Sequence, residues 1–407
     1  MARRMVVAAA IVFAGCSAQP PAQDAQKMVG TAGATELVAA DFGDPLPGSS
    51  ASDLALFQAG RVAFEQVEEV ADGLGPVFNE SSCVACHLGP GAAVGGSNGR
   101  LETRFGSNAG GTFDPLAGLG GSLIQDHAIG VVADGFEFKP EVVPAQATVV
   151  AHRRTTPLFG LGLVDAVPDG EIRAIAFVQS IFYPEIAGQV AVVTDLTANK
   201  LAVGKFGWKN GNPTLLQFSA DAYLNEMGIT SPLFPNENCP QGDCASLAHN
   251  PRPDLNDADG ADVQKFADFM TLLAPPPRGP QSLTTLRGEV VFEVIGCGVC
   301  HVSTLVTGRN AVAALDRKIF HPFSDFLLHD MGTLGDGIAQ GAAGPRQMRT
   351  APLWGVRASP TLLHDGRATT LADAIGAHDG QGADARDRFV RLDASSRFAL
   401  LAFLKSL

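Results

Sequence analysis

Two short motifs constrain this chain more than any other feature of its sequence. Residues 83–87 and 297–301 both have the form C-x-x-C-H. Two thiols on one turn can bond to the two vinyl groups of one haem, and the following His can bind its iron. A zinc site or a thioredoxin-like dithiol imitates part of one motif, but the dithiol needs a βαβ context that is missing here. Two motifs in one chain predict two covalently bound c-type haems. The predicted attachment residues and iron ligands are Cys83, Cys86, His87, Cys297, Cys300 and His301.

The surroundings of the two motifs resemble each other. Residues 60–67 (GRVAFEQV) precede the first motif, and residues 288–295 (GEVVFEVI) precede the second. Downstream, residues 152–160 (HRRTTPLFG) align with residues 347–355 (QMRTAPLWG). A repeat of this kind predicts two equivalent structural units. Its shared Arg154 and Arg349 are candidates to pair with haem propionates, because a guanidinium matches the geometry of a carboxylate.

We therefore expect a mainly α-helical protein of two cytochrome c-like domains arranged as a pseudo-repeat. The first haem domain covers residues 50–190, a long insert covers 191–280, and the second haem domain covers 281–407. Large loops are expected, because the chain has 46 Gly and 26 Pro. The acidic stretch 254–260 in the insert departs from an EF-hand, since Lys265 stands where the twelfth-position ligand is needed. It reads better as a solvated acidic loop.

The remaining cysteines and the net charge limit the environment and the partners that this protein can have. Cys239 and Cys244 flank a short Pro/Gly loop, and in an exported protein such a pair predicts a disulfide. A metal pair is the alternative, but no nearby pair of His residues supports it. The net charge of −13 argues against nucleic-acid binding, which needs a basic surface.

The N-terminus reads as a targeting segment. Arg3 and Arg4 precede a short apolar run that ends in Phe-Ala-Gly before Cys16. This pattern predicts a signal peptide over residues 1–15 and a lipidated Cys16 followed by a flexible tether over residues 16–49. An ordinary secretory signal or a buried apolar N-terminus is the alternative. The expected location is the periplasmic side of the bacterial envelope, with the protein anchored to a membrane as a lipoprotein.

Longer segments add to the two motifs and together resemble a known family. They are residues 73–79 (GLGPVFN), 157–163 (PLFGLGL), 206–209 (FGWK), 227–235 (MGITSPLFP), 328–332 (LHDMG) and 364–367 (HDGR). With the motifs, they make the chain resemble the di-haem oxidoreductase family, formerly called "thiol oxidoreductase". That family is related to the bacterial di-haem cytochrome c peroxidases. The matching segments run across nearly all of the chain after the signal peptide.

The resemblance directs attention to the sixth ligands of the two irons. In the peroxidase relatives a Met ligand stands two residues before the shared Arg of the second domain. Gln347 holds that position here, so Met348 or Met331 is the candidate, or the site is open. The equivalent first-domain residue is His152, and His127 is its rival. The resemblance also raises calcium as a further cofactor.

Other candidates carry competing readings. His329, His364 and His378 lie in or near the family-like segments, and each suits a propionate contact, a structural role or acid–base chemistry. Trp208 and Trp354 are the only Trp residues, and either could relay electrons between haems, although burial alone also explains a Trp.

The predicted function is that of a peroxidase-like oxidoreductase. Electrons would pass from a small redox protein through one haem to a small oxidant, such as hydrogen peroxide, at the other. The alternatives are a non-catalytic electron-transfer cytochrome, alone or in a periplasmic assembly, and an enzyme that oxidises a substrate other than peroxide. The old thiol label finds no support, because each Cys has another assignment.

Overall fold

The computed structural model describes residues 33–252 and 254–407. The predicted signal peptide, Cys16 and the first part of the tether lie outside the described residues. Its helices are α2 (Ala51–Glu65), α3 (Leu161–Asp165), α4 (Asp169–Phe182), α5 (Leu215–Met227), α6 (Ala261–Leu272), α7 (Leu283–Val294), α8 (Leu371–Gly376), α9 (Ala383–Arg391) and α10 (Ala394–Leu404). Within this part of the chain, no helix is both long and apolar enough to cross a membrane.

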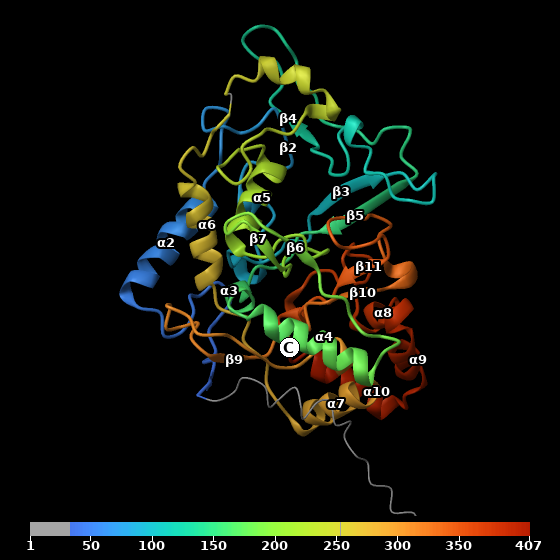
Figure 1. The fold of residues 1–407 in the computed structure, drawn as a ribbon. Coiled ribbons are helices and arrows are strands. Elements are labelled where there is room, and N and C mark those ends of the chain that lie inside the picture. Colours follow the sequence, from blue (N-terminus) through green and yellow to red (C-terminus); the bar gives the residue numbers. More distant parts are fainter. Residues whose placement is uncertain (1–32, 253) are drawn as a thin grey trace, which may run out of the picture.

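Short strands complement the helices, as Figure 1 shows. They are β1 (Thr35–Glu36), β2 (Val77–Phe78), β3 (Leu101–Gly106), β4 (His127–Ala128), β5 (Val149–Arg154), β6 (Val192–Asp195), β7 (Lys200–Val203), β8 (Leu305–Val306), β9 (Lys318–Phe320), β10 (Leu328–Asp330) and β11 (Gln347–Arg349). The pairs β2–β4, β3–β5, β6–β7 and β10–β11 are antiparallel, while β1 adds in parallel to the β8–β9 pair. The expectation of a mainly α-helical protein was therefore only partly right, because the fold mixes helix and sheet.

The helix before the first motif begins and packs for clear local reasons. Ser50 caps α2 through a capping box with Asp53, which satisfies backbone N–H groups at the helix start. Phe57 and Phe64 are buried on the face that packs against α6. Gly60 stands at the crossing, where a Cβ atom would lie 2.3 Å from the carbonyl oxygen of Lys265. The two helices lie side by side in Figure 1.

The helix before the second motif is built in the same way. Ser282 caps α7 through a capping box with Thr285, and α7 packs against α10. Gly288 stands at this crossing, where a Cβ atom would lie 2.0 Å from the carbonyl oxygen of Ala399. Gly288 is also the residue that aligns with Gly60 in the sequence. The aligned glycines thus serve the same purpose, which is close approach of a second helix.

The insert is part of the core rather than a separate appendage. Its α5 and α6 pack against each other, and α6 also packs against α2 and α3. The largest hydrophobic cluster accordingly joins Phe64 before the first motif with Tyr223 and Phe269 of the insert. A second cluster gathers Phe292, Phe389 and Phe403 around the second motif.

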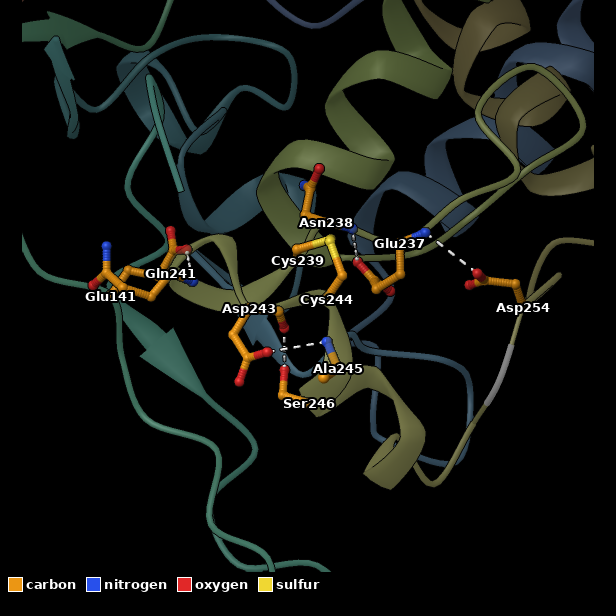
Figure 2. The surroundings of a disulfide bond; sticks show 10 residues. All are labelled: Glu141, Glu237, Asn238, Cys239, Gln241, Asp243, Cys244, Ala245, Ser246 and Asp254. Atoms are coloured by element: carbon orange, nitrogen blue, oxygen red, sulfur yellow. Dashed lines mark hydrogen bonds between the residues drawn. A yellow bond between two sulfur atoms is a disulfide. The ribbon is translucent and has the colours of Figure 1, made fainter. Parts of the chain in front are cut away.

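The disulfide of the insert fixes one end of the molecule. Cys239 and Cys244 are joined, and Figure 2 shows the short turn between them. Within that turn the backbone N–H of Gln241 donates to the carboxylate of Glu141 at 2.6 Å. The side chain of Gln241 donates to the carbonyl oxygen of Leu119 at 2.7 Å. The cross-linked turn therefore holds two loops of the first half of the chain in place.

Candidate functional site

Each motif lies on the wall of its own cavity. Cys83, Cys86 and His87 line a cavity of about 240 Å³, called here the first cavity. Cys297, Cys300 and His301 line a larger cavity of about 670 Å³, called here the second cavity. All four of these thiols are free, and burial raises the pKa of Cys86 and of Cys297 to about 12. Unpaired thiols beside a cavity are what thioether attachment of a haem requires.

The two motif histidines have the tautomer needed to bind iron. Nδ1 of His87 lies 3.3 Å from the carbonyl oxygen of Gly96, and Nδ1 of His301 lies 2.9 Å from that of Phe323. A carbonyl oxygen only accepts, so Nδ1 carries the proton in both rings and Nε2 keeps its lone pair. Burial lowers the pKa of each imidazole to about 4, so both rings stay neutral at physiological pH.

Aligned aromatic rings flank both histidines. The ring of Phe64 lies 5.9 Å from that of His87, and the ring of Phe292 lies 6.3 Å from that of His301. These two phenylalanines occupy equivalent positions in the segments that precede the motifs. The local surroundings of the two motifs therefore correspond in structure as well as in sequence.

The predicted propionate partners are buried arginines that form no ion pair among the described residues. Arg154 ends β5 and donates to the carbonyl oxygen of Leu363 and the hydroxyl of Ser359. Arg349 ends β11 and donates to the carbonyl oxygens of Gly207 and Thr350. Burial lowers the pKa of each guanidinium to about 10, and neither has a carboxylate within ion-pair distance in the described part of the chain. A haem propionate would supply the missing counter-charge.

A third arginine, which the sequence analysis did not single out, adds to this fit. Arg153 is only 2% exposed and lines the first cavity. Its Nε donates to Asp336 at 2.7 Å and its Nη1 to Gln340 at 2.6 Å. Its Nη2 is buried without a hydrogen-bond partner. Because buried donors are normally satisfied, this atom points to an anionic group in the cavity.

The two cavities differ sharply in polarity. Ionisable side chains crowd the wall of the first cavity. They are Glu80, Arg100, Glu102, Arg104, Arg153, Arg154, Lys209, Asp221 and Glu226. Apolar side chains such as Phe292, Leu353 and Leu400 form more of the wall of the second cavity, which is also lined by Arg154, Glu185, Arg349, Asp384, Arg386, Arg388 and four His residues. Polarity and hydrogen-bond donors near a haem decide between oxidant activation and electron transfer.

Asp336 ties the first cavity to the second half of the chain. Its carboxylate accepts from Arg153 at 2.7 Å and lies 2.9 Å from Nζ of Lys209. Burial alone would raise the pKa of Asp336, but the charges of Arg153 and Lys209 outweigh burial and hold it below its usual value. Lys209 also donates to the carbonyl oxygens of Gly344, before β11, and of Gln347, the first residue of β11. Strand β5, the insert and the β10–β11 region therefore meet in one ionic cluster.

The predicted sixth ligands of the first haem lie away from the first cavity. His152 is exposed on β5, where its Nδ1 lies 3.3 Å from the hydroxyl of Thr103. His127 is about half exposed, pairs with Asp126 and stacks on Phe78. Neither ring belongs to the wall of the first cavity, so the structure does not bring His152 or His127 together with the first motif. Strand alternation explains His152, because its neighbours Ala151 and Arg153 take the buried face of β5.

The predicted candidates for the sixth ligand of the second haem, Met348 and Met331, line the second cavity. Met348 is buried on β11 and lines the cavity together with Met331, His364 and His378. Gln347, by contrast, donates to the side chain of Gln189. A Met side chain at this wall can serve as the sixth ligand of an electron-transfer haem.

A buried His–Asp pair adjoins the second motif. Nε2 of His329 lies 2.9 Å from Asp325, which also accepts from Gln179 at 2.8 Å. Nδ1 of the same His lies 3.7 Å from the sulfur of Cys300. Burial alone would raise the pKa of Asp325, but His329 and these hydrogen bonds hold it below its usual value. His329 therefore belongs to a buried hydrogen-bonded pair on the wall of the second cavity.

The two tryptophans differ in position. Trp208 lines both cavities, and its indole N–H donates to the carbonyl oxygen of Arg154 at 2.9 Å. Its ring also meets that of His364 edge-on at 6.2 Å. Trp354 instead packs on Phe320, with ring centroids 5.9 Å apart. Of the two relay candidates, only Trp208 stands between the cavities.

Comparison with known families decides the assignment. A family described as "Di-haem oxidoreductase, putative peroxidase" matches residues 142–407, which is more than half of the chain. The chain belongs to the di-haem oxidoreductase family. Membership implies haem cofactors and a redox function. No curated protein matches the chain significantly.

Two solved structures are similar to this di-haem oxidoreductase at low identity. The match to hydrazine synthase of Kuenenia stuttgartiensis covers 100% of this chain and 100% of that chain, with 13% identity and a TM-score of 0.39. A MauG-like protein associated with microbial copper homeostasis covers 91% of this chain and 94% of its own, with 14% identity and the same TM-score of 0.39. At these values neither likeness indicates the function of this chain.

Several residues of the first cavity that sequence reasoning missed in this di-haem oxidoreductase lie in the insert. They are Glu226, Asp221 and Lys209. One signal was present, because Lys209 belongs to the family-like segment 206–209. Among the described residues, only Cys300, Asp325 and His329 bring three metal-type ligand atoms together. That set does not suit calcium, which prefers oxygen ligands, so calcium stays a prediction without an assigned site.

Proposed function

We propose that this protein is an exported di-haem c-type cytochrome that reduces a small oxidant, such as hydrogen peroxide, at the first cavity. The supporting observation is that charged side chains form a larger share of the wall of the first cavity than of the second, and that the two cavities share Arg154 and Trp208. When bound, the haems store electrons and offer an iron site where an oxidant can be reduced. A small redox protein would donate electrons on the side of the second cavity.

The chain's own residues would hold the two haems by matching contacts. Cys83 and Cys86 would attach the first haem and Cys297 and Cys300 the second, with His87 and His301 as iron ligands. Free thiols and Nδ1-protonated rings beside the two cavities support this assignment. Arg153, Arg154 and Arg349 would neutralise the propionates. Met348 would complete the second haem site.

The two haem-binding units would form a pseudo-repeat. Three pairs of aligned residues support it: Gly60 with Gly288 at helix crossings, Phe64 with Phe292 beside the motif histidines, and Arg154 with Arg349 at strand ends. The units would span residues 50–190 and 281–407, with the insert 191–280 packed between them. Export as a lipoprotein anchored through Cys16 would place the protein on the periplasmic side of the envelope.

Mass spectrometry and peroxide titration of the reduced protein test this function together. The mature chain is expected to carry the mass of two haems after denaturation. One equivalent of peroxide is then expected to oxidise the fully reduced protein by two electrons. If peroxide leaves the reduced spectrum unchanged while both haems are attached, the protein is an electron-transfer cytochrome instead.

A further inference from the structure

A carboxyl group from the insert is clamped to the wall of the first cavity. Glu226 stands one residue before the end of α5 and lines the cavity with the first motif. Its backbone carbonyl oxygen accepts from the N–H groups of Asn79 and Glu80 at 2.7 and 3.2 Å. The side-chain amide of Asn79 also donates to the carboxylate of Glu226 at 2.9 Å. These bonds fix the carboxyl group to the segment that leads directly into Cys83.

Other charged groups face Glu226 from several elements. From β3 come Glu102 and Arg104, which pair with each other at 2.6 Å. From α5 comes Asp221, whose carboxylate accepts from the amides of Asn212 and Asn225, each at 2.9 Å. The remaining charged groups of the wall are Arg154, which forms no ion pair among the described residues, and two ion-paired sets. These sets are Glu80 with Arg100, and Arg153 and Lys209 with Asp336.

Glu226 differs from its neighbours because its carboxylate has a single neutral hydrogen-bond donor among the described residues. Glu102 has an arginine at contact distance and Asp221 has two amides, whereas Glu226 has only the amide of Asn79 among the described residues. Burial and then the charge of Glu102 raise the pKa of Glu226 to about 7, against the smaller opposing effects of Asn79 and Arg104. This carboxyl group therefore gains or loses a proton within the physiological range.

We propose that Glu226 takes up a proton from solvent each time an electron reaches the first haem. The electron adds one negative charge to a cavity that already holds the carboxylates of Glu102 and Asp221. In a poorly solvated cavity, proton uptake by the nearest titratable carboxyl group relieves this repulsion. One electron from the donor and one proton from solvent enter together, and the carboxylate becomes a carboxylic acid. The inference rests on the proposed haem in the first cavity.

This coupling would serve the proposed reaction. Reduction of one molecule of peroxide to two molecules of water takes two electrons and two protons. Glu226 would bring one of these protons into the cavity with the electron that reaches the first haem, and solvent would supply the second proton. The O–O bond would then break with one proton already beside the oxidant.

The reduction potential of the first haem, measured against pH, tests the coupling without reference to turnover. In the wild-type holoprotein the potential is expected to change by about 59 mV per tenfold change in proton concentration above pH 7. Glu226→Gln is expected to abolish this slope, and Glu226→Asp to retain a slope with a shifted midpoint. Glu80→Gln is the matched control, because Glu80 lines the same cavity but is paired with Arg100, and it is expected to keep the slope.

Proton uptake by the wild type gives a second readout that needs no variant. Reduction of the holoprotein in weak buffer with an indicator dye is expected to remove protons from solution near pH 7. A flat potential in the wild type, or an unchanged slope in Glu226→Gln, would overturn the inference. The proposed function can fail separately, since a protein that does not react with peroxide still shows the slope if Glu226 is coupled to the first haem.

Discussion

The substitution Asp336→Asn tests whether the buried ionic cluster holds the two halves of the chain together. Asp336 accepts from Arg153 and contacts Lys209, and the exposed fractions of these three side chains are 1%, 3% and 1%. Removing one partner of a buried ion pair costs about 3–5 kcal/mol, because the remaining charge stays buried without compensation. Here two cations lose their shared anion. Hydrogen bonds from Lys209 to backbone carbonyls and from Arg153 to Gln340 remain, so we expect a loss within that range.

Urea unfolding of the holoprotein, followed by far-ultraviolet circular dichroism, measures this loss. Asp330→Asn is the matched control, because Asp330 pairs with Arg346 at the surface and their side chains are 36% and 68% exposed. An exposed pair contributes less than about 1 kcal/mol. The double variant Asp336→Asn with Lys209→Met is expected to recover part of the loss, since it removes one of the stranded charges.

The stability of the protein at low pH should also depend on this ionic cluster. Because the folded-state pKa of Asp336 lies below its usual value, its contribution is present at neutral pH. It is lost as pH falls through the folded-state pKa, and the Asp336→Asn variant lacks this part of the acid sensitivity. A loss of stability no larger than that of Asp330→Asn would refute the reasoning.

Three further predictions concern other parts of the chain. Burial raises the pKa of Glu237 from 4.5 to about 8, so the folded state binds its proton more tightly than the unfolded state and stability falls as pH rises across that interval. Glu237→Gln should therefore be roughly 3–5 kcal/mol more stable than the wild type at pH 9 in urea unfolding, with no difference below pH 4.5. Replacing Cys239 and Cys244 by Ser should lower the free energy of unfolding by about 2 kcal/mol, as expected for a short closed loop, and a loss near zero would show that the turn in Figure 2 is held by other contacts. His152→Ala should leave the absorption spectrum of the first haem unchanged because the ring is exposed, whereas Met348→Leu should change the spin state of the second haem in electron paramagnetic resonance.

Local chemistry made part of this molecule predictable from its sequence. Each C-x-x-C-H motif is a run of five consecutive residues that can be recognised without knowing the fold. The structure places both motifs on cavity walls. The repeat aligned Gly60 with Gly288, and the structure places both glycines where a second helix approaches closely. The disulfide of Cys239 and Cys244 followed from their closeness in the chain.

The features of the fold and of the first cavity that the sequence did not predict have physical causes. His152 was chosen by alignment, but the side chains of a strand alternate, and the face that meets the cavity depends on pairing with β3. Two-residue strands such as β2 and β4 carry too little periodic signal to be recognised. The polar wall of the first cavity joins β3, α5 and the loop at Asp336, which lie far apart in sequence. Only the folded chain brings those charges together.

Electron paramagnetic resonance of the holoprotein, oxidised and half-reduced, before and after addition of hydrogen peroxide, tests the central claim most directly. The account predicts two haems in different states. One should have an open coordination position and a signal that changes with peroxide, and the other should be six-coordinate. Two six-coordinate haems that peroxide leaves unchanged in every redox state would contradict the assignment of oxidant reduction to the first cavity.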